Sequence, residues 1–305
     1  MTEKWAAFTR QVRKNRLLFL MATAVLVWYA VFRYVPYWWN IIAFKDFQWG
    51  LGFQNSPWIG LGNFRALFRD PEFYKVLRNT LVISGLKLAV SFPFPILLAI
   101  LLNEVFHAAF RKTVQTVIFI PFFISWVIYA SILSAILSPS SGMLNFLISS
   151  LGGKPIYFLA SETWFRAILV VSDLLKNSGY YTVIYMAALA GVDEEVYEAA
   201  ICDGANLFQR IRHITLPGIA PVITILFILK LGQILTVDFE QVYILYNPMV
   251  YSVGDVIDTF NYRQGIQGGR FSYTTALGLF NSTIGFIMVL SSNWVLQKLT
   301  DNGLW

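Results

Sequence analysis

A few ionisable side chains interrupt long apolar stretches of this chain, and their presence there requires a physical or functional reason. Lys87, Asp173, Lys176 and Lys230 each lie among apolar neighbours. On insertion scales, an ionisable residue in a membrane-spanning helix costs roughly 2.5–3.5 kcal/mol. Asp173 and Lys176 are three positions apart and share a helical face, so we expect them to neutralise each other. Lys87 and Lys230 have no acid nearby in sequence, so each either lines a polar path or pairs with an acid on another helix.

Further polar and aromatic side chains extend this candidate path. Gln233 follows Lys230 by three positions, and aromatic rings offer flat apolar faces on which a ring-shaped solute can stack. The candidate path residues are Lys87, Trp126, Tyr129, Asp173, Lys176, Tyr181, Lys230 and Gln233. Three of them are lysines, so the path would attract an anionic solute. Because aromatic residues make up 17% of the chain, any single ring is more typical of core packing or of an interfacial belt.

Other chemistries lack the residues that they need. One cysteine, Cys202, excludes a disulfide framework and a multi-cysteine metal site. His107 and His213 are far apart and have no acid at ligand spacing, so we expect no metal site. The sequence contains no G-x-x-x-x-G-K-[ST] motif, so we expect no ATP bound through a P-loop and no cofactor on this chain.

The elements that must position the path residues are long apolar helices. Hydrophobic residues make up 57% of the 305 residues and charged residues 13%, whereas soluble domains have about 25% charged residues. This composition excludes a soluble or a disordered chain and predicts an all-α integral membrane protein. A helix needs roughly 20 apolar residues to cross a bilayer. Six stretches predict transmembrane helices, at 17–39, 76–102, 114–137, 165–190, 219–237 and 273–296.

The net charge of +6 is explained by topology rather than by a nucleic-acid partner. Residues 1–16 carry five basic side chains and one acid, and basic flanks favour the cytoplasmic side. We therefore expect a cytoplasmic basic tail at 1–16. The first helix with its external loop would occupy 17–75 and a transmembrane core 76–297. Six helices would return the tail at 298–305 to the cytoplasm.

The predicted cytoplasmic loop at 191–217 is far longer than a hairpin needs. The acidic run 193–195 suits a helix N-terminus and predicts a short helix at 196–201. Gly204 can adopt the left-handed conformation that ends it, and a second short helix is expected at 207–214. Two short helices joined by a glycine turn form a protrusion that can dock into a groove of another protein.

This loop resembles the EAA loop of ABC-importer permeases. The family pattern is Glu-Ala-Ala, three residues, Gly, nine residues and Ile-x-Leu-Pro, and the sequence matches it at that spacing. The loop residues concerned are Glu198, Ala199, Ala200, Asp203, Gly204, Ala205, Ile214, Leu216 and Pro217. Cys202 departs from the aliphatic or small residue expected there. Alone, the acidic run would be a solvated helix face, but the full spacing between two spans favours docking.

Other motifs are similar to sugar-importer permeases of the MalF/UgpA/LplB type across nearly the whole chain. They lie at 62–64, 79–81, 99–104, 121–126, 187–191, 243–248 and 258–260. The similarity points to the LplB-like branch, whose members handle complex oligo- and polysaccharides. It implies a type I ABC-importer transmembrane domain in the bacterial cytoplasmic (inner) membrane, with both termini in the cytoplasm.

The resemblance also implies partners. In that family the EAA loop holds the coupling helix, which sits in a cleft of a separate ATPase, so Glu198 and Gly204 would be the central docking positions. ATP and Mg would lie on that ATPase, and this chain would be a transport subunit rather than an enzyme. The expected partners are a second, non-identical permease, two ATPase subunits, an extracytoplasmic solute-binding protein, a saccharide and membrane lipid, with no nucleic acid.

The lysines of the candidate path suggest that the saccharide is acidic, such as a uronate oligosaccharide. The alternative from another class is a membrane-embedded enzyme, such as a glycosyltransferase or a protease. Such an enzyme would need a nucleophile or a cluster of catalytic acids at membrane depth, which Asp173 alone does not supply.

Overall fold

The computed structural model describes residues 10–12, 14–300 and 303, and over these residues it is helical, with one isolated β-bridge. Parts of the two predicted cytoplasmic tails, residues 1–9, 13, 301–302 and 304–305, lie outside the described residues. The chain forms two compact units, Met1–Leu67 with Arg270–Leu279, and Phe68–Gly269 with Phe280–Trp305.

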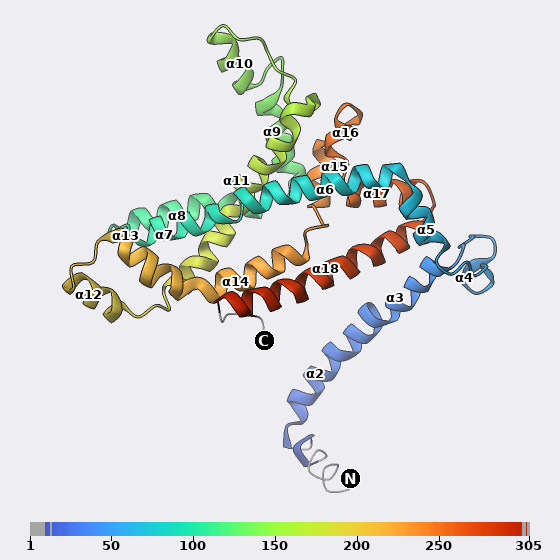
Figure 1. Cartoon of the computed structure of the whole chain (residues 1–305), viewed down its shortest axis with the longest axis horizontal. Helices are drawn as coiled ribbons and strands as arrows, with labels where there is room; N and C mark the ends of the chain where they lie inside the picture. The colour runs from blue at the N-terminus through green and yellow to red at the C-terminus, as the bar shows by residue number, and fades with distance from the viewer. Residues whose placement is uncertain (1–9, 13, 301–302, 304–305) are drawn as a thin grey trace. The chain divides into compact units, whose positions relative to one another are not determined.

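The α-helices carry the labels of Figure 1, and the short 3₁₀- and π-helical segments between them are labelled η1 to η6 in chain order. They are α2 (Arg16–Tyr29), η1 (Ala30–Tyr34), α3 (Val35–Tyr37), η2 (Trp38–Phe44), α4 (Gly52–Asn55), α5 (Gly62–Arg69), α6 (Pro71–Val90), α7 (Pro93–Asn103), α8 (Ala108–Phe123), α9 (Trp126–Leu137), α10 (Met143–Ser150), η3 (Phe158–Ala160), α11 (Glu162–Leu189), α12 (Glu194–Cys202), α13 (Leu207–Arg210), η4 (Ile211–Thr215), α14 (Leu216–Gly232), α15 (Phe239–Leu245), η5 (Pro248–Val250), α16 (Tyr251–Gly254), α17 (Ile257–Tyr262), η6 (Arg263–Gln267) and α18 (Phe271–Thr300).

In the first unit, the apolar stretch Arg16–Phe44 is helical throughout and long enough to cross a bilayer. No residue of α2 is buried, so its apolar sides are free to contact lipid. A compact loop follows and is closed by the bridge between Lys45 and Trp58. The buried Lys45 ammonium fixes this loop by donating to the backbone oxygens of Phe53 (2.8 Å) and Gln54 (3.2 Å).

In the second unit, α11 is the central helix and packs against α6, α7, α8 and α14. Gly179 allows α11 and α8 to approach closely, because a Cβ at this position would lie 2.0 Å from the carbonyl oxygen of Ile118. The first turns of α11 join an apolar core in which Phe165 and Leu169 are fully buried. This packing fixes the side chains that α11 presents to α6 and α14.

By length and composition, four helical stretches of the described chain can span a membrane: Arg16–Phe44, Pro71–Asn103, Leu207–Gly232 and Phe271–Lys298. The pair α8 and α9 forms a fifth if its bend is allowed. The predicted fourth span corresponds to α11, which has 28 residues and is long enough but carries more polar and charged side chains. The predicted all-α membrane architecture is therefore confirmed, with one of the six expected helices less apolar than the others.

The stretch predicted as the third span, 114–137, is not one straight helix, because α8 and α9 meet at 104°. Pro121 lies in the last turn of α8, and Ile124 beyond it is extended. Ser125 then caps α9 by accepting a hydrogen bond from the backbone N–H of Ile128 (3.4 Å). The chain therefore ends one helix and begins another within three residues.

The second short helix expected at 207–214 does not end there. Helix continues from Leu207 to Gly232, with a π-helical turn at Ile211–Thr215. Pro217, which has no N–H, follows directly, and the wider turn accommodates it without ending the helix. The second part of the predicted docking loop, from Leu207 onward, and the next span are thus one continuous helix.

Candidate translocation cavity and docking loop

A cavity of about 320 Å³ lies in the second unit between α6, α11 and the end of α14. Five of the candidate path residues line it, namely Lys87, Asp173, Tyr181, Lys230 and Gln233. Trp126, Tyr129 and Lys176 do not line it. Lys87 and Lys230, which are 143 positions apart in sequence, therefore meet around one polar space together with residues of α11.

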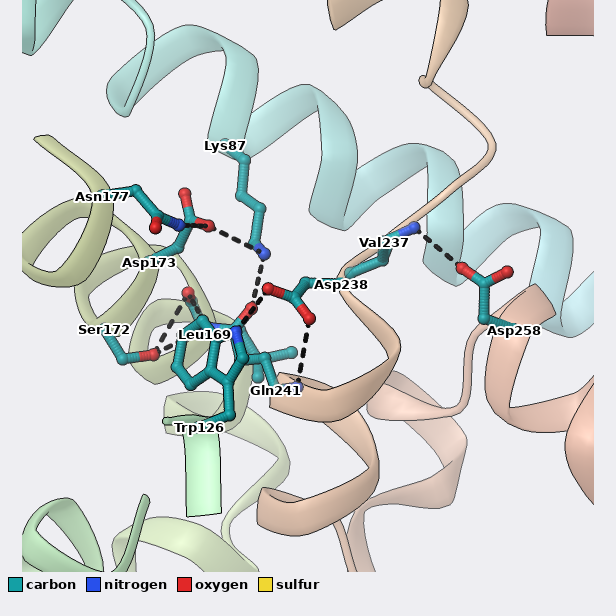
Figure 2. Close-up of polar contacts among 10 residues, drawn as sticks. All are labelled: Lys87, Trp126, Leu169, Ser172, Asp173, Asn177, Val237, Asp238, Gln241 and Asp258. Atoms are coloured by element: carbon teal, nitrogen blue, oxygen red, sulfur yellow. Dashed lines mark hydrogen bonds and ion pairs between the residues drawn. The ribbon is translucent and has the colours of Figure 1, made fainter. Parts of the chain in front are cut away.

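Lys87 and Asp173 form an ion pair in the wall of this cavity (Figure 2). The Lys87 ammonium lies 3.4 Å from Oδ1 of Asp173 and donates to Oε1 of Gln241 at 2.5 Å. Gln241 is fully buried and donates in turn to the Leu169 carbonyl (2.7 Å) and the Ser172 hydroxyl (2.8 Å). Lys87 therefore both lines the cavity and pairs with an acid on another helix, and the network joins α6, α11 and α15.

Lys176 does not line the cavity, and its side chain instead caps the C-terminal end of α8. Its buried ammonium donates to three backbone oxygens at the break between α8 and α9, those of Pro121 (3.2 Å), Phe122 (3.1 Å) and Ile124. The expected pairing of Lys176 with Asp173 is therefore wrong. The last carbonyls of a helix have no partner within it, so they attract a donor that sequence spacing would assign elsewhere.

Trp126 links that break to the cavity. Its indole N–H donates to Oδ2 of Asp238 at 2.5 Å, and Asp238 lines the cavity. Asp238 also caps α15 by accepting from the backbone N–H of Gln241 (3.4 Å). The rings of Trp126 and Tyr129 lie 5.3 Å and 5.9 Å from the Lys176 ammonium, within the range of cation–π attraction.

Lys230 is the cavity cation that has no ion pair among the described residues. Its ammonium lies 4.8 Å from the centre of the Tyr181 ring, which supports a positive charge without neutralising it. Lys87 is opposed by Asp173, and Asp238 is bonded to Trp126. Lys230 is thus free to bind an anionic group of a solute.

Three hydroxyls in the cavity wall were not identified from the sequence pattern as a group. Ser84 Oγ, Ser91 Oγ and Tyr185 Oη are buried and have no hydrogen-bond partner among the described residues. Buried polar atoms without a partner are uncommon, and each can bond to water or to a hydroxyl of a solute. Ser84 lies in α6 and Ser91 caps its end seven positions later, so both lie on one side of this helix, a signal that periodicity could have given.

Asp258 lies beside the cavity wall, outside the membrane-spanning helices. Its Oδ2 accepts the backbone N–H of Val237 at 3.0 Å (Figure 2). Burial raises the pKa of Asp258 to about 6, and the negative charge of Asp238 adds to this rise, while the Val237 hydrogen bond opposes it. This carboxyl group therefore titrates just below neutral pH.

The candidate docking loop, residues 191–217, is stabilised by helix caps that its own residues form. Asp193 accepts the backbone N–H of Glu195 (3.0 Å) at the start of α12, and Gly204 ends the turn after α12 with φ +80°. Asn206 and Gln209 form a capping box that starts α13. The predicted short helix and glycine turn are therefore present, and the helix has the wider bounds of α12.

The loop exposes both its signature residues and apolar side chains. Glu198, Ala199, Asp203, Gly204, Leu216 and Pro217 are exposed, and Ala200, Ala205 and Ile214 are half-buried. Ile201 is 54% and Phe208 69% exposed, so the loop also presents large apolar side chains on its surface. Tyr197 fastens α12 to the long helix through a hydrogen bond to Thr215 (3.0 Å). Figure 1 shows α12 at the end of the second unit that holds α13, away from α15–α17.

Long apolar helices, a polar cavity among them and an exposed, self-capped loop together define a membrane transport subunit. Residues 91–301 match the family described as "Binding-protein-dependent transport system inner membrane component". The chain belongs to this family, and its fold is that of a type I ABC-importer permease.

Individual relatives cover nearly the whole chain. Protein LplB of Bacillus subtilis (strain 168) is 42% identical over 99% of this chain and 95% of its own length. The polygalacturonan/rhamnogalacturonan transport system permease protein YteP of the same organism is 44% identical over 96% of this chain and 91% of its own length. These relatives confirm the predicted kinship with LplB-type permeases.

Solved structures agree with this placement. A bacterial ABC transporter involved in the import of the acidic polysaccharide alginate contains a chain that is 39% identical, with a TM-score of 0.89 over 96% of this chain and 99% of that chain. A second structure of a bacterial alginate ABC transporter, in complex with an alginate pentasaccharide-bound periplasmic protein, matches at 38% identity, with a TM-score of 0.89 over 97% of this chain and 99% of that chain.

Proposed function

We propose that this chain is the pore-forming permease subunit of an ATP-driven importer of acidic oligo- or polysaccharides. The observation that carries the proposal is Lys230, a cation without an ion pair in a cavity that also holds three unpaired hydroxyls, all among the described residues. A uronate offers a carboxylate for the ammonium and hydroxyls for the serines and tyrosine. The relatives named for polygalacturonan and alginate support the same class of substrate.

Different residues of the cavity would bind different groups of the saccharide. Lys230 would bind the carboxylate by a charge-assisted hydrogen bond, while the Tyr181 ring beside it offers an apolar face to the sugar ring. Lys87 is neutralised by Asp173, and the carboxylate of Asp238, which also lines the cavity, opposes the binding of an anion, so that binding is weak enough for release. Import would follow from a shift between two states of the pore that differ in affinity for the solute.

The exposed loop would transmit the energy of ATP. Glu198 and Gly204 would dock into a cleft of one of the two ATPase subunits, with ATP and Mg bound on those subunits. The exposed side chains of Ile201 and Phe208 suit burial in such an interface. Because the loop continues into Leu207–Gly232, a displacement of the loop moves the helix that carries Lys230.

The remaining partners follow from the same family membership. A second, non-identical permease would complete the pore, and an extracytoplasmic solute-binding protein would deliver the saccharide, as the periplasmic protein in the similar complex suggests. Both termini would lie in the cytoplasm. The family is described as a transport system component and YteP is named as a transport system permease protein, which favours this function over a glycosyltransferase or a protease.

The test is uptake by the complete importer in proteoliposomes, comparing a uronate oligosaccharide with a neutral one. Lys230→Gln should lower uptake of the acidic substrate far more than that of the neutral one, because only the acidic one uses the ammonium. Lys112→Gln, an exposed lysine outside the cavity, is the matched control. An equal loss for both substrates would show that Lys230 does not select charge.

A further inference from the structure

The loop that follows the first span, residues 45–61, exposes several large apolar side chains. Trp49 is 75% and Trp58 65% exposed, and Leu51 and Ile59 are exposed as well. A group of exposed apolar side chains in one short loop indicates a surface that contacts lipid or another protein rather than water.

This loop also keeps its positive charge away from its surface. Its charged residues are Lys45 and Asp46. Lys45 is buried, and its ammonium lies 5.1 Å and 5.0 Å from the ring centres of Phe53 and Trp58. Asp46 is exposed at the start of the loop, beside the bridge that closes it. The rest of the loop, from residue 47 to residue 61, therefore offers no charged side chain to a partner.

Hydrogen bonds hold the loop at the end of the first span. The backbone N–H of Ile59 donates to the carbonyl of Phe44 at 3.0 Å. The side-chain amide of Asn63 donates to the carbonyls of Ala43 (2.8 Å) and Lys45 (2.9 Å). Because these bonds join both ends of the loop to the last residues of the span, the depth of the loop follows from the length of the span.

The length of the first span places the loop at the level of lipid headgroups. Arg16–Phe44 has 29 residues, which at 1.5 Å per residue amounts to roughly 43 Å. A bilayer measures about 30 Å across its hydrocarbon core and about 40–45 Å with its headgroup layers. A helix of this length that starts in one headgroup layer therefore ends in the other. Tryptophan favours this layer, because it has an apolar ring system and a polar N–H.

We propose that loop 45–61 lies in the headgroup layer of the outer leaflet, and that the exposed rings of Trp49 and Trp58 anchor it there on phospholipid. This inference goes beyond the proposed function. An uncharged surface that carries tryptophan suits the boundary between headgroups and acyl chains. A solute-binding protein that associates and dissociates would leave these rings in water for part of each cycle, whereas lipid covers them throughout.

The anchor would also hold the start of the last span. The backbone N–H of Phe47 donates to the hydroxyl of Ser272 at 2.9 Å. The ring of Trp49 meets that of Phe271 edge to face, with centroids 5.2 Å apart and planes at 89°. Phe271 and Ser272 are the first two residues of α18. The loop would therefore fix the start of α18 at the same depth as the end of the first span.

A spin label in this loop measures its depth directly. The complete importer is reconstituted in phosphatidylcholine nanodiscs with partner chains that lack reactive thiols. Cys202→Ser removes the one thiol of this chain, and Leu51→Cys provides the labelling site. Oxygen concentrates in lipid and a nickel chelate in water, so the ratio of their collision rates with the label reports depth. Val27→Cys, in α2, gives the lipid reference, and Lys154→Cys, at an exposed lysine, gives the aqueous reference.

We expect the oxygen-to-nickel ratio at position 51 to be several-fold higher than at position 154 and lower than at position 27. In a second measurement, the combined substitutions Trp49→Ser and Trp58→Ser should raise the nickel collision rate at position 51 several-fold. Trp164→Ser, at an exposed tryptophan outside the loop, is the matched control and should leave that rate unchanged. If the double variant fails to assemble, the depth of the label beside the two native tryptophans still decides the case.

Three results would overturn the proposal. A nickel collision rate at position 51 equal to that at position 154 would place the loop in water. A label that neither reagent reaches would show that the second permease covers the loop. Protection that appears only when the solute-binding protein is added would make that protein the occupant. The measurement uses neither ATP nor saccharide, so each of these results leaves the proposed function standing.

Discussion

Replacing Lys176 by methionine removes the side chain that fastens the sharp bend between α8 and α9. In the structure its ammonium donates to three backbone oxygens at the end of α8 and is buried. Methionine fills similar space but offers no donor. We expect Lys176→Met to loosen the bend and to displace Trp126, whose indole holds Asp238 at the cavity wall.

The expected cost follows from these contacts. A buried acceptor that loses its partner costs about 1–3 kcal/mol, and three acceptors are affected. Part of this cost is offset, because methionine needs no desolvation of a buried ammonium and water can reach some of the freed carbonyls. We therefore expect a net loss of about 3 kcal/mol in the free energy of unfolding.

Thermal unfolding of the purified chain in detergent measures this loss. With a shift of about 2 °C per kcal/mol for a chain of this size, the midpoint should fall by about 6 °C. Lys75→Met, at an exposed lysine, should leave the midpoint unchanged, and Lys176→Arg should recover part of the loss because it restores donors. A midpoint for Lys176→Met within about 1 °C of the wild type would refute the reasoning.

Two further predictions concern single contacts. Because burial raises the pKa of Asp258 from 3.8 to about 6, the ionised form is disfavoured in the folded state, and stability falls as pH rises from about 4 to 6 by up to about 3 kcal/mol. The amide oxygen of Asp258→Asn can still accept the Val237 N–H. This variant should therefore have a higher unfolding midpoint than the wild type, and the difference should be larger at pH 7.5 than at pH 5. An equal difference at both pH values would exclude burial of the Asp258 charge as the cause of the stabilisation. Gly179→Ala should destabilise the chain by several kcal/mol, because its Cβ would lie 2.0 Å from the Ile118 oxygen. A Gly179→Ala variant that assembles and melts like the wild type would show that α8 and α11 can move apart freely.

Much of the docking loop could be predicted from sequence, because its chemistry is local. Asp193, Gly204 and Asn206 act on backbone groups within a few residues of themselves, so their types and spacing are sufficient. The end of the second short helix was wrong for the opposite reason. A proline inside a helix usually ends it, but here the π-helical turn before Pro217 lets the helix continue.

The cavity could be predicted only in part, because its contacts join distant segments. Spacing correctly placed Asp173 and Lys176 on neighbouring positions of one helix, but it could not show that carbonyls 52–55 positions away would attract Lys176. Asp173 forms its ion pair with Lys87 instead, 86 positions away in sequence. The bend at Ile124 was missed because residues 114–137 are uniformly apolar and hydropathy does not register the direction of a helix.

The most direct test of the central claim is ATP-driven uptake of a labelled uronate oligosaccharide by the complete importer, with Glu198→Lys compared to wild type. We predict uptake by the wild-type importer that requires ATP and the solute-binding protein. Glu198 is exposed and does not line the cavity, so Glu198→Lys should leave the chain folded and the cavity unchanged. Because Glu198 is a central docking position in this account, the same variant should lose uptake and co-purification of the ATPase. Uptake by the Glu198→Lys importer at the wild-type rate, with the ATPase still bound, would contradict coupling through this loop.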